Sequence, residues 1–256
     1  MTFVEYTAPR SPTGTTPLCI MENKKIALVT GGNKGIGREI VRGLLRAGCR
    51  VYLGAREAAK GQQAVAELVA EGEVEFLEVD LTNPATLDAA ATQLQRTHGY
   101  LDILVNNAGI NVAGDGRASS AAVRSVELVL QTNFLGTLAV TQAFLPLLKQ
   151  ASAGRIVNVS SPLASLTLSG LNDWGLLGYS ASKAALNMLT VQLAYELRDT
   201  VIKVNSANPG YTATDLNGFA GTDTPAQSAA EAIRLALLPV DGPTGTTSSA
   251  NGPLPW

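Results

Sequence analysis

The sequence predicts an α/β fold: a doubly wound parallel sheet of the Rossmann type with helices on both faces, in one domain over residues 24–256. Three observations lead to this prediction. Short β-branched apolar runs alternate with longer amphipathic segments, a glycine-rich turn follows the first run, and no repeat or linker divides the chain. The length of 256 residues and a hydrophobic content of 46% suit a single full-sized core.

Apolar runs and helix end signals place the elements of the first half. The run from Ile26 to Thr30 has the composition of a buried strand, and Gly48 ends the helix that follows it. Asn83 is a helix cap followed by Pro84 at the first helical position. The predicted elements are a strand at 26–30, a helix at 36–47, a strand at 50–54, a helix at 57–70, a strand at 74–79, a helix from Pro84 and a strand at 101–105.

The second half continues the same alternation, with two long helices on either side of a strand. Thr224 and Pro225 mark the start of the last helix, as a cap and a first helical residue. The predicted elements are a helix at 120–150, a strand at 155–159, a helix at 179–198, a strand at 201–206, a helix from Pro225 and a last edge strand at 244–248.

Composition excludes several classes of function. A net charge of −2 gives no electrostatic reason to expect nucleic acid or an anionic membrane as partner. No run of about 18 apolar residues suggests a membrane span. The two cysteines, Cys19 and Cys49, predict free thiols in a reducing, cytoplasmic compartment, and with His98 as the single histidine we expect no metal site.

Residues 1–23 differ from the rest of the chain. They contain Pro9, Pro12 and Pro17, and their apolar run from Leu18 to Met21 is too short for the core of a signal peptide. We therefore expect a flexible N-terminal tail ahead of the catalytic domain.

The turn at residues 31–37, Gly-Gly-Asn-Lys-Gly-Ile-Gly, directly follows the first strand and opens the first helix. Glycines let a backbone approach a pyrophosphate, which the helix N-terminus stabilises. The spacing is Gly-x-x-x-Gly-x-Gly rather than Gly-x-Gly-x-x-Gly, and an ordinary glycine turn is the alternative. Strand, turn and helix in this order favour a dinucleotide site.

A phenol and an ammonium stand four residues apart in Tyr179-Ser-Ala-Ser-Lys183. Residues at this spacing share one helix face, and a nearby cation lowers the pKa of a phenol, which makes it a usable general acid or base. By itself the pattern is common on solvated helix surfaces.

These motifs together resemble the short-chain dehydrogenase/reductase family, over residues 24–256. The resemblance rests on the glycine turn, the pair Tyr179 and Lys183, and further motifs in the family's order: Asp80, Asn106-Asn-Ala-Gly109, Asn133, Ser160-Ser161 and Asn208-Pro-Gly210. The glycine turn and the ending Gly252-Pro-Leu-Pro-Trp256 are most similar to the carbonyl-reductase-like branch.

The resemblance implies a catalytic set of Asn133, Ser161, Tyr179 and Lys183. Tyr179 would protonate a carbonyl oxygen, Ser161 would hydrogen-bond that oxygen, and Lys183 would lower the tyrosine pKa and hold the nicotinamide ribose. Asn133 would hold a water that links the lysine to solvent. From chemistry alone Ser160 and Ser161 are equivalent candidates, and Asn133 could be a buried helix amide.

The resemblance also implies a set of cofactor contacts. Asp80 and Leu81 would contact the adenine, and the segment 107–109 would line the crevice. The full set is Gly31, Asn33, Lys34, Gly35, Ile36, Gly37, Arg56, Asp80, Leu81, Asn107, Ala108, Gly109, Tyr179, Lys183, Pro209, Gly210 and Thr212.

The cofactor is predicted to be NADP(H). An NAD site usually has an acidic residue at the end of the second strand, but Ala55 and Arg56 stand there, and Lys34 lies in the glycine turn. Two cations without a carboxylate suit a 2′-phosphate. Glu57 could approach the ribose, although an acid also suits the start of the next helix.

Apolar residues flank the predicted nicotinamide site. Leucines and Trp174 lie within 162–178, and Tyr211 follows Gly210, so Trp174 and Tyr211 are the predicted substrate pocket. Core packing is the alternative for about half of the leucines. The pocket predicts a neutral ketone or aldehyde. A 3-oxoacyl thioester reductase, a secondary-alcohol dehydrogenase and a non-catalytic cofactor-binding regulator remain alternatives, and the two long helices suit a homodimer or homotetramer.

Overall fold

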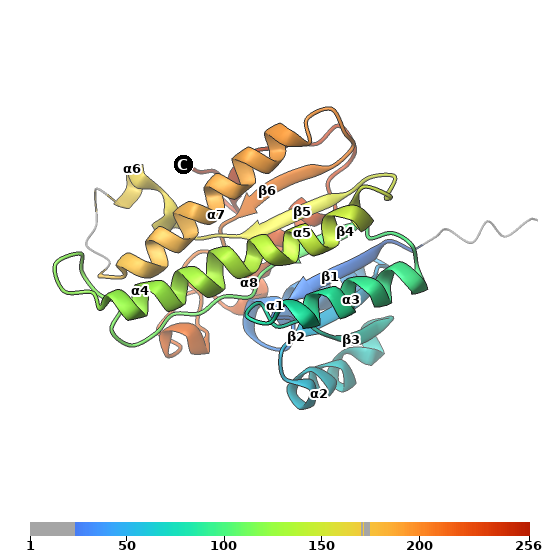
Figure 1. Cartoon of the computed structure of the whole chain (residues 1–256), viewed down its shortest axis with the longest axis horizontal. Coiled ribbons are helices and arrows are strands. Elements are labelled where there is room, and N and C mark those ends of the chain that lie inside the picture. The colour runs from blue at the N-terminus through green and yellow to red at the C-terminus, as the bar shows by residue number, and fades with distance from the viewer. Residues whose placement is uncertain (1–23, 170, 172–174) are drawn as a thin grey trace, which may run out of the picture.

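The structure, a computed structural model, describes residues 24–169, 171 and 175–256. The segment 1–23, predicted as a flexible tail, and Trp174 of the predicted pocket lie outside the described residues. Within the described part the chain forms an eight-stranded sheet in the order β3-β2-β1-β4-β5-β6-β7-β8 (Figure 1). All neighbouring strands are parallel except the pair β7 and β8. The predicted doubly wound α/β fold is confirmed.

Strands and helices alternate along the chain as predicted, with bounds shifted by a few residues. The strands are β1 Ile26–Thr30, β2 Arg50–Ala55, β3 Val74–Glu78, β4 Ile103–Asn106, β5 Arg155–Val159, β6 Lys203–Ala207, β7 Thr247–Ser249 and β8 Gly252–Pro253. The helices are α1 Gly35–Arg46, α2 Ala58–Leu68, α3 Pro84–Thr97, α4 Val123–Leu130, α5 Thr137–Leu148, α6 Leu166–Ser169, α7 Leu177–Glu196 and α8 Pro225–Ala236.

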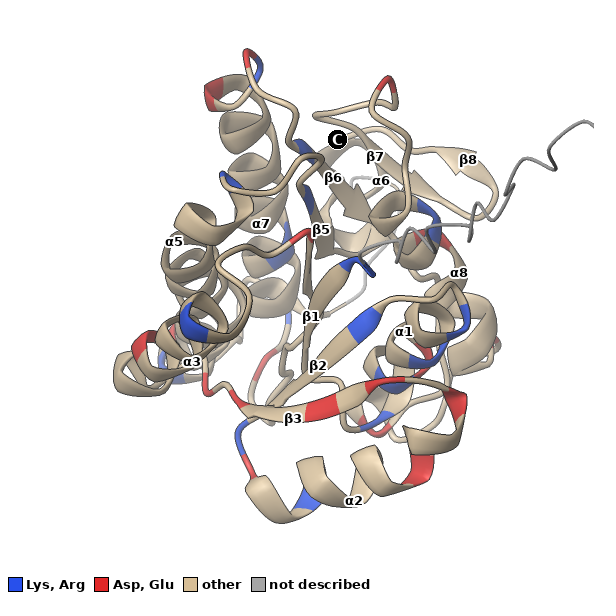
Figure 2. Cartoon of the chain, turned by 90° about the vertical axis from the view of Figure 1, so that its right-hand side faces the viewer, with Lys and Arg blue, Asp and Glu red and all other residues tan. Residues whose placement is uncertain are grey.

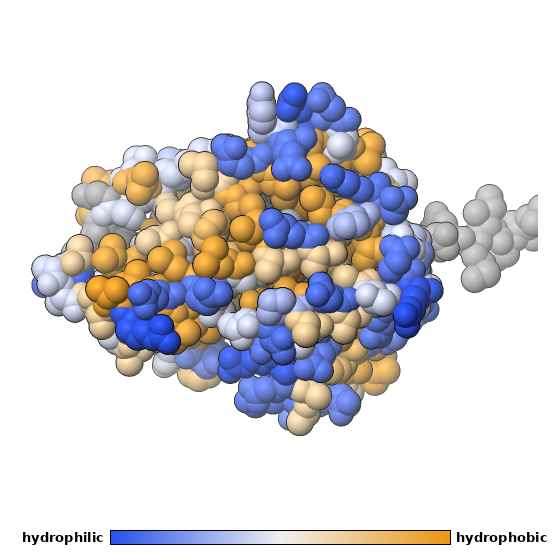
Figure 3. Space-filling model, in the orientation of Figure 1, coloured by the Kyte–Doolittle hydropathy of each residue, from blue (hydrophilic) through white to orange (hydrophobic). Residues whose placement is uncertain are grey.

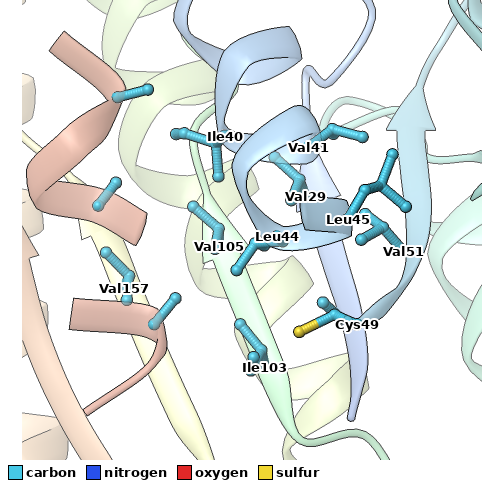
Figure 4. Close-up of a cluster of buried hydrophobic side chains, with 14 of the residues drawn as sticks. Val29, Ile40, Val41, Leu44, Leu45, Cys49, Val51, Ile103, Val105 and Val157 are labelled. Atoms are coloured by element: carbon cyan, nitrogen blue, oxygen red, sulfur yellow. The ribbon is translucent and has the colours of Figure 1, made fainter. Parts of the chain in front are cut away.

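Two helical layers cover the sheet. Figure 2 shows α3, α5 and α7 on one side and α1 and α8 on the other, with charges of both signs scattered over the surface. Successive strand residues point to opposite faces, so Val29 joins the core under α1 and α8, whereas Leu28 joins the core under α3, α5 and α7. Figure 4 shows the first of these cores, where Ile40 and Leu44 of α1 meet Val105 of β4. Cys49 lies buried in it as a free thiol.

Two predicted elements differ from the structure. The last edge strand, predicted at 244–248, is β7 at Thr247–Ser249, and the outer position belongs to the short antiparallel β8. The single helix predicted at 120–150 is divided by a π-helical turn, Gln131–Gly136, which connects α4 to α5. Apolar periodicity does not reveal such a turn, because a π-helical turn shifts the apolar pattern by only one residue.

The helical span Val123–Leu148 is long and apolar enough to cross a membrane by length and composition alone. The prediction that no such run exists is therefore wrong. In the fold this span packs as a core helix does: α4 contacts α7, α5 contacts α3 and β4, and Phe144 of α5 is fully buried.

Candidate active site

The glycine turn lies between β1 and α1, at the point where the strand order reverses between β1 and β4. Gly31 and Gly35 have φ angles of +64° and +53°, which side chains rarely adopt. A Cβ on Gly37 would lie 2.2 Å from the carbonyl oxygen of Gly31 and 2.4 Å from Nδ2 of Asn107. The turn is therefore a backbone cradle at a helix N-terminus, the geometry that suits a pyrophosphate.

The loop after β4 fixes this cradle from the neighbouring strand. Nδ2 of Asn107 donates to the carbonyl oxygens of Thr30 and Gly31, at 2.9 and 3.2 Å. The Thr30 hydroxyl accepts from the backbone amides of Asn107 and Ala108. The side chain of Asn107 thus shapes the crevice, while its direct contact with a cofactor stays a prediction.

Tyr179 and Lys183 lie on one face of α7, as their spacing predicts. The ammonium of Lys183 is 5.7 Å from the centre of the Tyr179 ring and donates to the carbonyl oxygen of Val159, at 2.7 Å. Lys183 is only 4% exposed. Its charge is therefore held against the carboxyl end of β5, beside the tyrosine.

The structure separates the two candidate serines. Ser160 donates to Oδ1 of Asn187 at 2.7 Å and is committed to the core beneath α7. Ser161 accepts from the amide of Leu163, and its side chain lies beside the Tyr179 phenol, where it acts to lower the pKa of that group. Geometry thus favours Ser161, the second serine, as the group that faces a substrate.

Asn133 lies in the π-helical turn and ties three segments together. Its side chain accepts from the amide of Ile110 at 2.8 Å, donates to the carbonyl oxygen of Ile110 at 2.9 Å and donates to the hydroxyl of Ser182 at 3.1 Å. A Cβ on Gly109 would lie 3.3 Å from Oδ1 of Asn133 and 3.6 Å from Nζ of Lys183. The four predicted catalytic residues therefore come from α7, the π turn and the end of β5, and meet at one edge of the sheet.

Burial dominates the titration of the two central groups. It raises the pKa of Tyr179 to about 12, against the opposing effect of the Ser161 hydrogen bond, and lowers the pKa of Lys183 to about 8. Burial therefore outweighs any lowering of the tyrosine pKa by Lys183, and that effect of the lysine stays a prediction. A phenol with this pKa stays protonated at neutral pH, as a proton donor must.

Comparison with known proteins agrees with this geometry. Residues 25–224 match the family model described as short chain dehydrogenase. The chain is 34% identical to "Carbonyl reductase [NADPH] 1" of Mus musculus, over 91% of this chain and 99% of that one. It is 32% identical to the salutaridine reductase of Papaver somniferum, over 87% and 93%. A structure of NADPH-bound carbonyl reductase from chicken fatty liver superimposes with a TM-score of 0.81 at 28% identity, covering 91% of this chain and 99% of that one.

The chain belongs to the short-chain dehydrogenase family. Within the family, the carbonyl-reductase-like branch predicted from the glycine turn and the chain ending is confirmed.

The predicted ribose-phosphate site of this family member differs from expectation. Lys34 forms an ion pair with Asp215, and Arg56 lies 3.6 Å from a carboxylate oxygen of Glu57, which also pairs with Lys60 at 2.7 Å. The prediction left open that Glu57 approaches this site, and in the structure Glu57 and Asp215 place carboxylates beside the two cations. The side chains of Lys34 and Arg56 are 63% and 67% exposed, and exposed ion pairs are weak, so an incoming phosphate can replace their carboxylate partners.

Other predicted cofactor residues have local partners. The carboxylate of Asp80 accepts from the amide and hydroxyl of Thr82, which closes the turn after β3. Leu81 packs against Gly136, where a Cβ would come within 2.7 Å of it. The hydroxyl of Thr212 shares a hydrogen bond with Ser228 of α8. Their contacts with a cofactor remain predictions.

Exposed apolar side chains lie on the two segments that are predicted to flank the nicotinamide, one before and at the start of α7 and one after Gly210. Tyr211 is 55% exposed, and Gly210 before it has a φ of +82°. The segment after Tyr211 passes over the glycine turn, because a Cβ on Gly35 would lie 3.4 Å from Thr214. The exposed apolar residues of this region are Leu166, Leu171, Leu177, Tyr211, Leu216 and Phe219.

Sequence reasoning missed Asp115, which lies in the loop between β4 and α4. Its carboxylate accepts from the amides of Gly178 and Tyr179 at the start of α7. The only sequence signal was an isolated acid in a glycine-containing loop, far along the chain from the tyrosine. Across residues 24–169, 171 and 175–256, no group of His, Cys, Asp or Glu could hold a metal ion.

Proposed function

We propose that this enzyme reduces the carbonyl of a small, largely apolar ketone or aldehyde to the alcohol with NADPH, reversibly. It is an NADP-dependent oxidoreductase of the short-chain dehydrogenase family. The relatives named carbonyl reductase and salutaridine reductase support ketone reduction in general. The finer assignment of substrate is our inference.

One feature of the site carries the chemistry: Tyr179, whose raised pKa keeps it protonated at neutral pH, lies beside Ser161 and the buried ammonium of Lys183. Bound NADPH would supply the hydride for the carbonyl carbon. Tyr179 gives its proton to the carbonyl oxygen, and Ser161 donates a hydrogen bond to the same oxygen. The nearby ammonium stabilises the phenolate that remains, which offsets the cost of forming it in a buried site.

The residues present fit NADP(H). Gly31 and Gly37 leave no room for side chains where a pyrophosphate would approach, and α1 presents its N-terminus there. Lys34 and Arg56 supply cations for a 2′-phosphate. Ala55, at the end of β2, leaves that strand without the acid that an NAD ribose prefers.

The apolar residues on the two segments predicted to flank the nicotinamide support the substrate class. Tyr211, Leu171 and Phe219 are apolar and mostly exposed, as a face that meets an apolar ligand would be. A 3-oxoacyl thioester or a secondary alcohol is the second candidate for the same chemistry.

Partners and location complete the proposal. Figure 3 shows apolar side chains gathered over the face of α4, α5 and α7, where Val123, Leu128, Leu135, Met188 and Tyr195 are exposed. Such a face suits a second copy of the chain in a homodimer or homotetramer. Light scattering at micromolar concentration tests this. The buried free thiol of Cys49 suits a reducing, cytoplasmic location.

A substrate panel tests the function. Initial rates with NADPH are measured for small ketones, bulky apolar ketones, aldehydes and a 3-oxoacyl thioester, and then repeated with NADH. We expect the highest kcat/KM for a neutral apolar ketone with NADPH. A thioester preference of tenfold or more would move the assignment to the second candidate, and no turnover with any substrate would favour the regulator.

A further inference from the structure

We propose that Asp115 is a positioning residue for the reaction: its carboxylate clamps the first turn of α7 and thereby sets the place of the Tyr179 hydroxyl. The catalytic part of this inference rests on the proposed reductase function. The clamp itself is a property of the fold.

Three successive amides at the start of α7 are satisfied by two neighbouring residues of one distant loop. Oδ1 of Asp115 accepts from the amide of Gly178 at 2.7 Å, and Oδ2 accepts from the amide of Tyr179 at 2.8 Å. The carbonyl oxygen of Gly116 accepts from the amide of Leu177 at 2.9 Å. Both carboxylate oxygens of Asp115 therefore accept hydrogen bonds from the backbone of α7, the helix that carries Tyr179.

This end of α7 cannot cap itself. The first amides of a helix lack partners within the helix, and a side-chain oxygen at the N-cap position usually satisfies one of them. Here Leu176 stands at that position and has no polar side-chain atom. Asp115 replaces the missing cap, and its negative charge also complements the positive end of the helix dipole.

The loop that carries Asp115 is itself fixed at several points. Asn133 holds Ile110 at its start through both backbone groups. The amide of Ala122 donates to the carbonyl oxygen of Gly114, and the amide of Asp115 donates to that of Val112. The Asp115 carboxylate therefore lies on a loop that several hydrogen bonds hold in place, and it can fix the position of the first turn of α7.

Gly178 supports the same interpretation from the helix side. A Cβ there would lie 3.2 Å from Oδ1 of Asp115 and 3.1 Å from Cα of Val126. The helix thus approaches both the carboxylate and α4 more closely than a side chain at this position would comfortably allow.

The clamp should act on Tyr179 more than on Lys183. Asp115 binds the backbone nitrogen of Tyr179 itself, whereas Lys183 lies one turn further along and is anchored separately on Val159. Loss of the carboxylate should move the phenol away from Ser161 while leaving the cofactor crevice in place. A misplacement of about 1 Å can reduce turnover about 100-fold.

Three variants test the clamp: Asp115→Ala, Asp115→Asn and the control Ser125→Ala. The control removes a hydrogen bond from the same loop but leaves α7 untouched. We expect Asp115→Ala to lower kcat about 10- to 100-fold with NADPH Kd within about twofold of wild type. Asp115→Asn keeps one acceptor, so its kcat should lie between those of wild type and Asp115→Ala. Ser125→Ala should keep wild-type kcat. A kcat within twofold for Asp115→Ala, an equal loss in Ser125→Ala, or a loss confined to NADPH affinity would overturn the positioning role.

Amide hydrogen exchange gives a readout that needs no turnover. The amides of Gly178 and Tyr179 should be protected in wild type and in Ser125→Ala. Both should lose protection in the folded Asp115→Ala protein, and one of them in folded Asp115→Asn, which keeps one acceptor. Unchanged protection would overturn the clamp. If exchange follows the expected pattern and wild type reduces no carbonyl compound, the clamp stands and the proposed reductase function fails.

Discussion

The two ends of the crevice are built differently. At the cofactor end, Gly31, Gly37 and Asn107 interlock through backbone groups, with no space for added atoms. At the predicted substrate end, Tyr211 and Phe219 expose most of their surface.

This difference indicates which end tolerates amino-acid substitutions. Overpacking a backbone cradle forces shifts that cost stability, whereas exposed apolar side chains can be exchanged at little cost. Cofactor binding should therefore tolerate almost no substitution, and substrate preference should change readily. The chemistry at Tyr179 lies between the two ends and depends on both.

Tyr179→Phe should produce the largest single effect. The ring remains but the proton donor is lost, and a positioned general acid contributes about 10²- to 10⁴-fold. We expect kcat for ketone reduction to fall by that factor, with NADPH affinity unchanged by fluorescence titration. Tyr195→Phe, at an exposed tyrosine of the same helix, is the control. A variant that keeps more than about a tenth of wild-type kcat would remove Tyr179 from the role of acid.

The double substitution Lys34→Ala with Arg56→Ala should reduce the preference for NADPH over NADH by about 10- to 100-fold. A hydrogen bond to a charged group contributes about 1.5–3 kcal/mol, and solvent exposure and the existing carboxylate partners reduce that. The ratio of kcat/KM for the two cofactors is the measurement. Lys60→Ala, which also removes a partner of Glu57, should leave the ratio unchanged. An unaltered ratio in the double variant would place the phosphate site elsewhere.

Gly37→Ala should weaken NADPH binding about tenfold or more. The added Cβ would lie 2.2 Å from the oxygen of Gly31, and overpacking of this kind costs about 1–3 kcal/mol. Calorimetric titration measures the effect. Gly116→Ala, where the nearest atom would be 3.7 Å away, should bind NADPH normally. Equal affinities in the two variants would contradict the cradle.

Tyr211→Ala should give the smallest effect. Because the side chain is 55% exposed, the free energy of unfolding should change by no more than about 0.5 kcal/mol. The ratio of kcat/KM for a bulky against a small ketone should change about three- to tenfold, since adding or removing apolar contact in a pocket contributes about 1–3 kcal/mol at most. Tyr211→Phe should keep the wild-type ratio. An unchanged ratio in Tyr211→Ala would exclude this residue from the pocket.

The sequence was sufficient for the sheet, the cradle and the tyrosine–lysine pair, because each depends on local spacing. Alternation of apolar runs specifies parallel strands, and a spacing of four specifies a shared helix face. The choice of Ser161 over Ser160 needed the structure, since the direction of each side chain depends on contacts with Asn187 and Tyr179.

What could not be predicted depends on contacts between distant segments. Asp115 acts on α7 across 63 residues of sequence, and Lys34 meets Asp215 across 181. The pKa of Tyr179 is raised rather than lowered because burial outweighs the opposing effect of Ser161, and burial is a property of the assembled fold. The π turn at Asn133 is similarly invisible, since its apolar pattern continues from α4 into α5.

The buried ammonium of Lys183 gives the folded state an unusual response to alkali. Its pKa falls from 10.5 to about 8 on burial, so between these values the unfolded chain holds the proton and the folded protein does not. Raising the pH across that window should therefore stabilise the fold through this one group, by about 3 kcal/mol at most. Catalysis and stability thus have opposite requirements at Lys183. The charge that would serve the reaction at neutral pH lowers the free energy of unfolding, and the other interactions of the core must compensate for it.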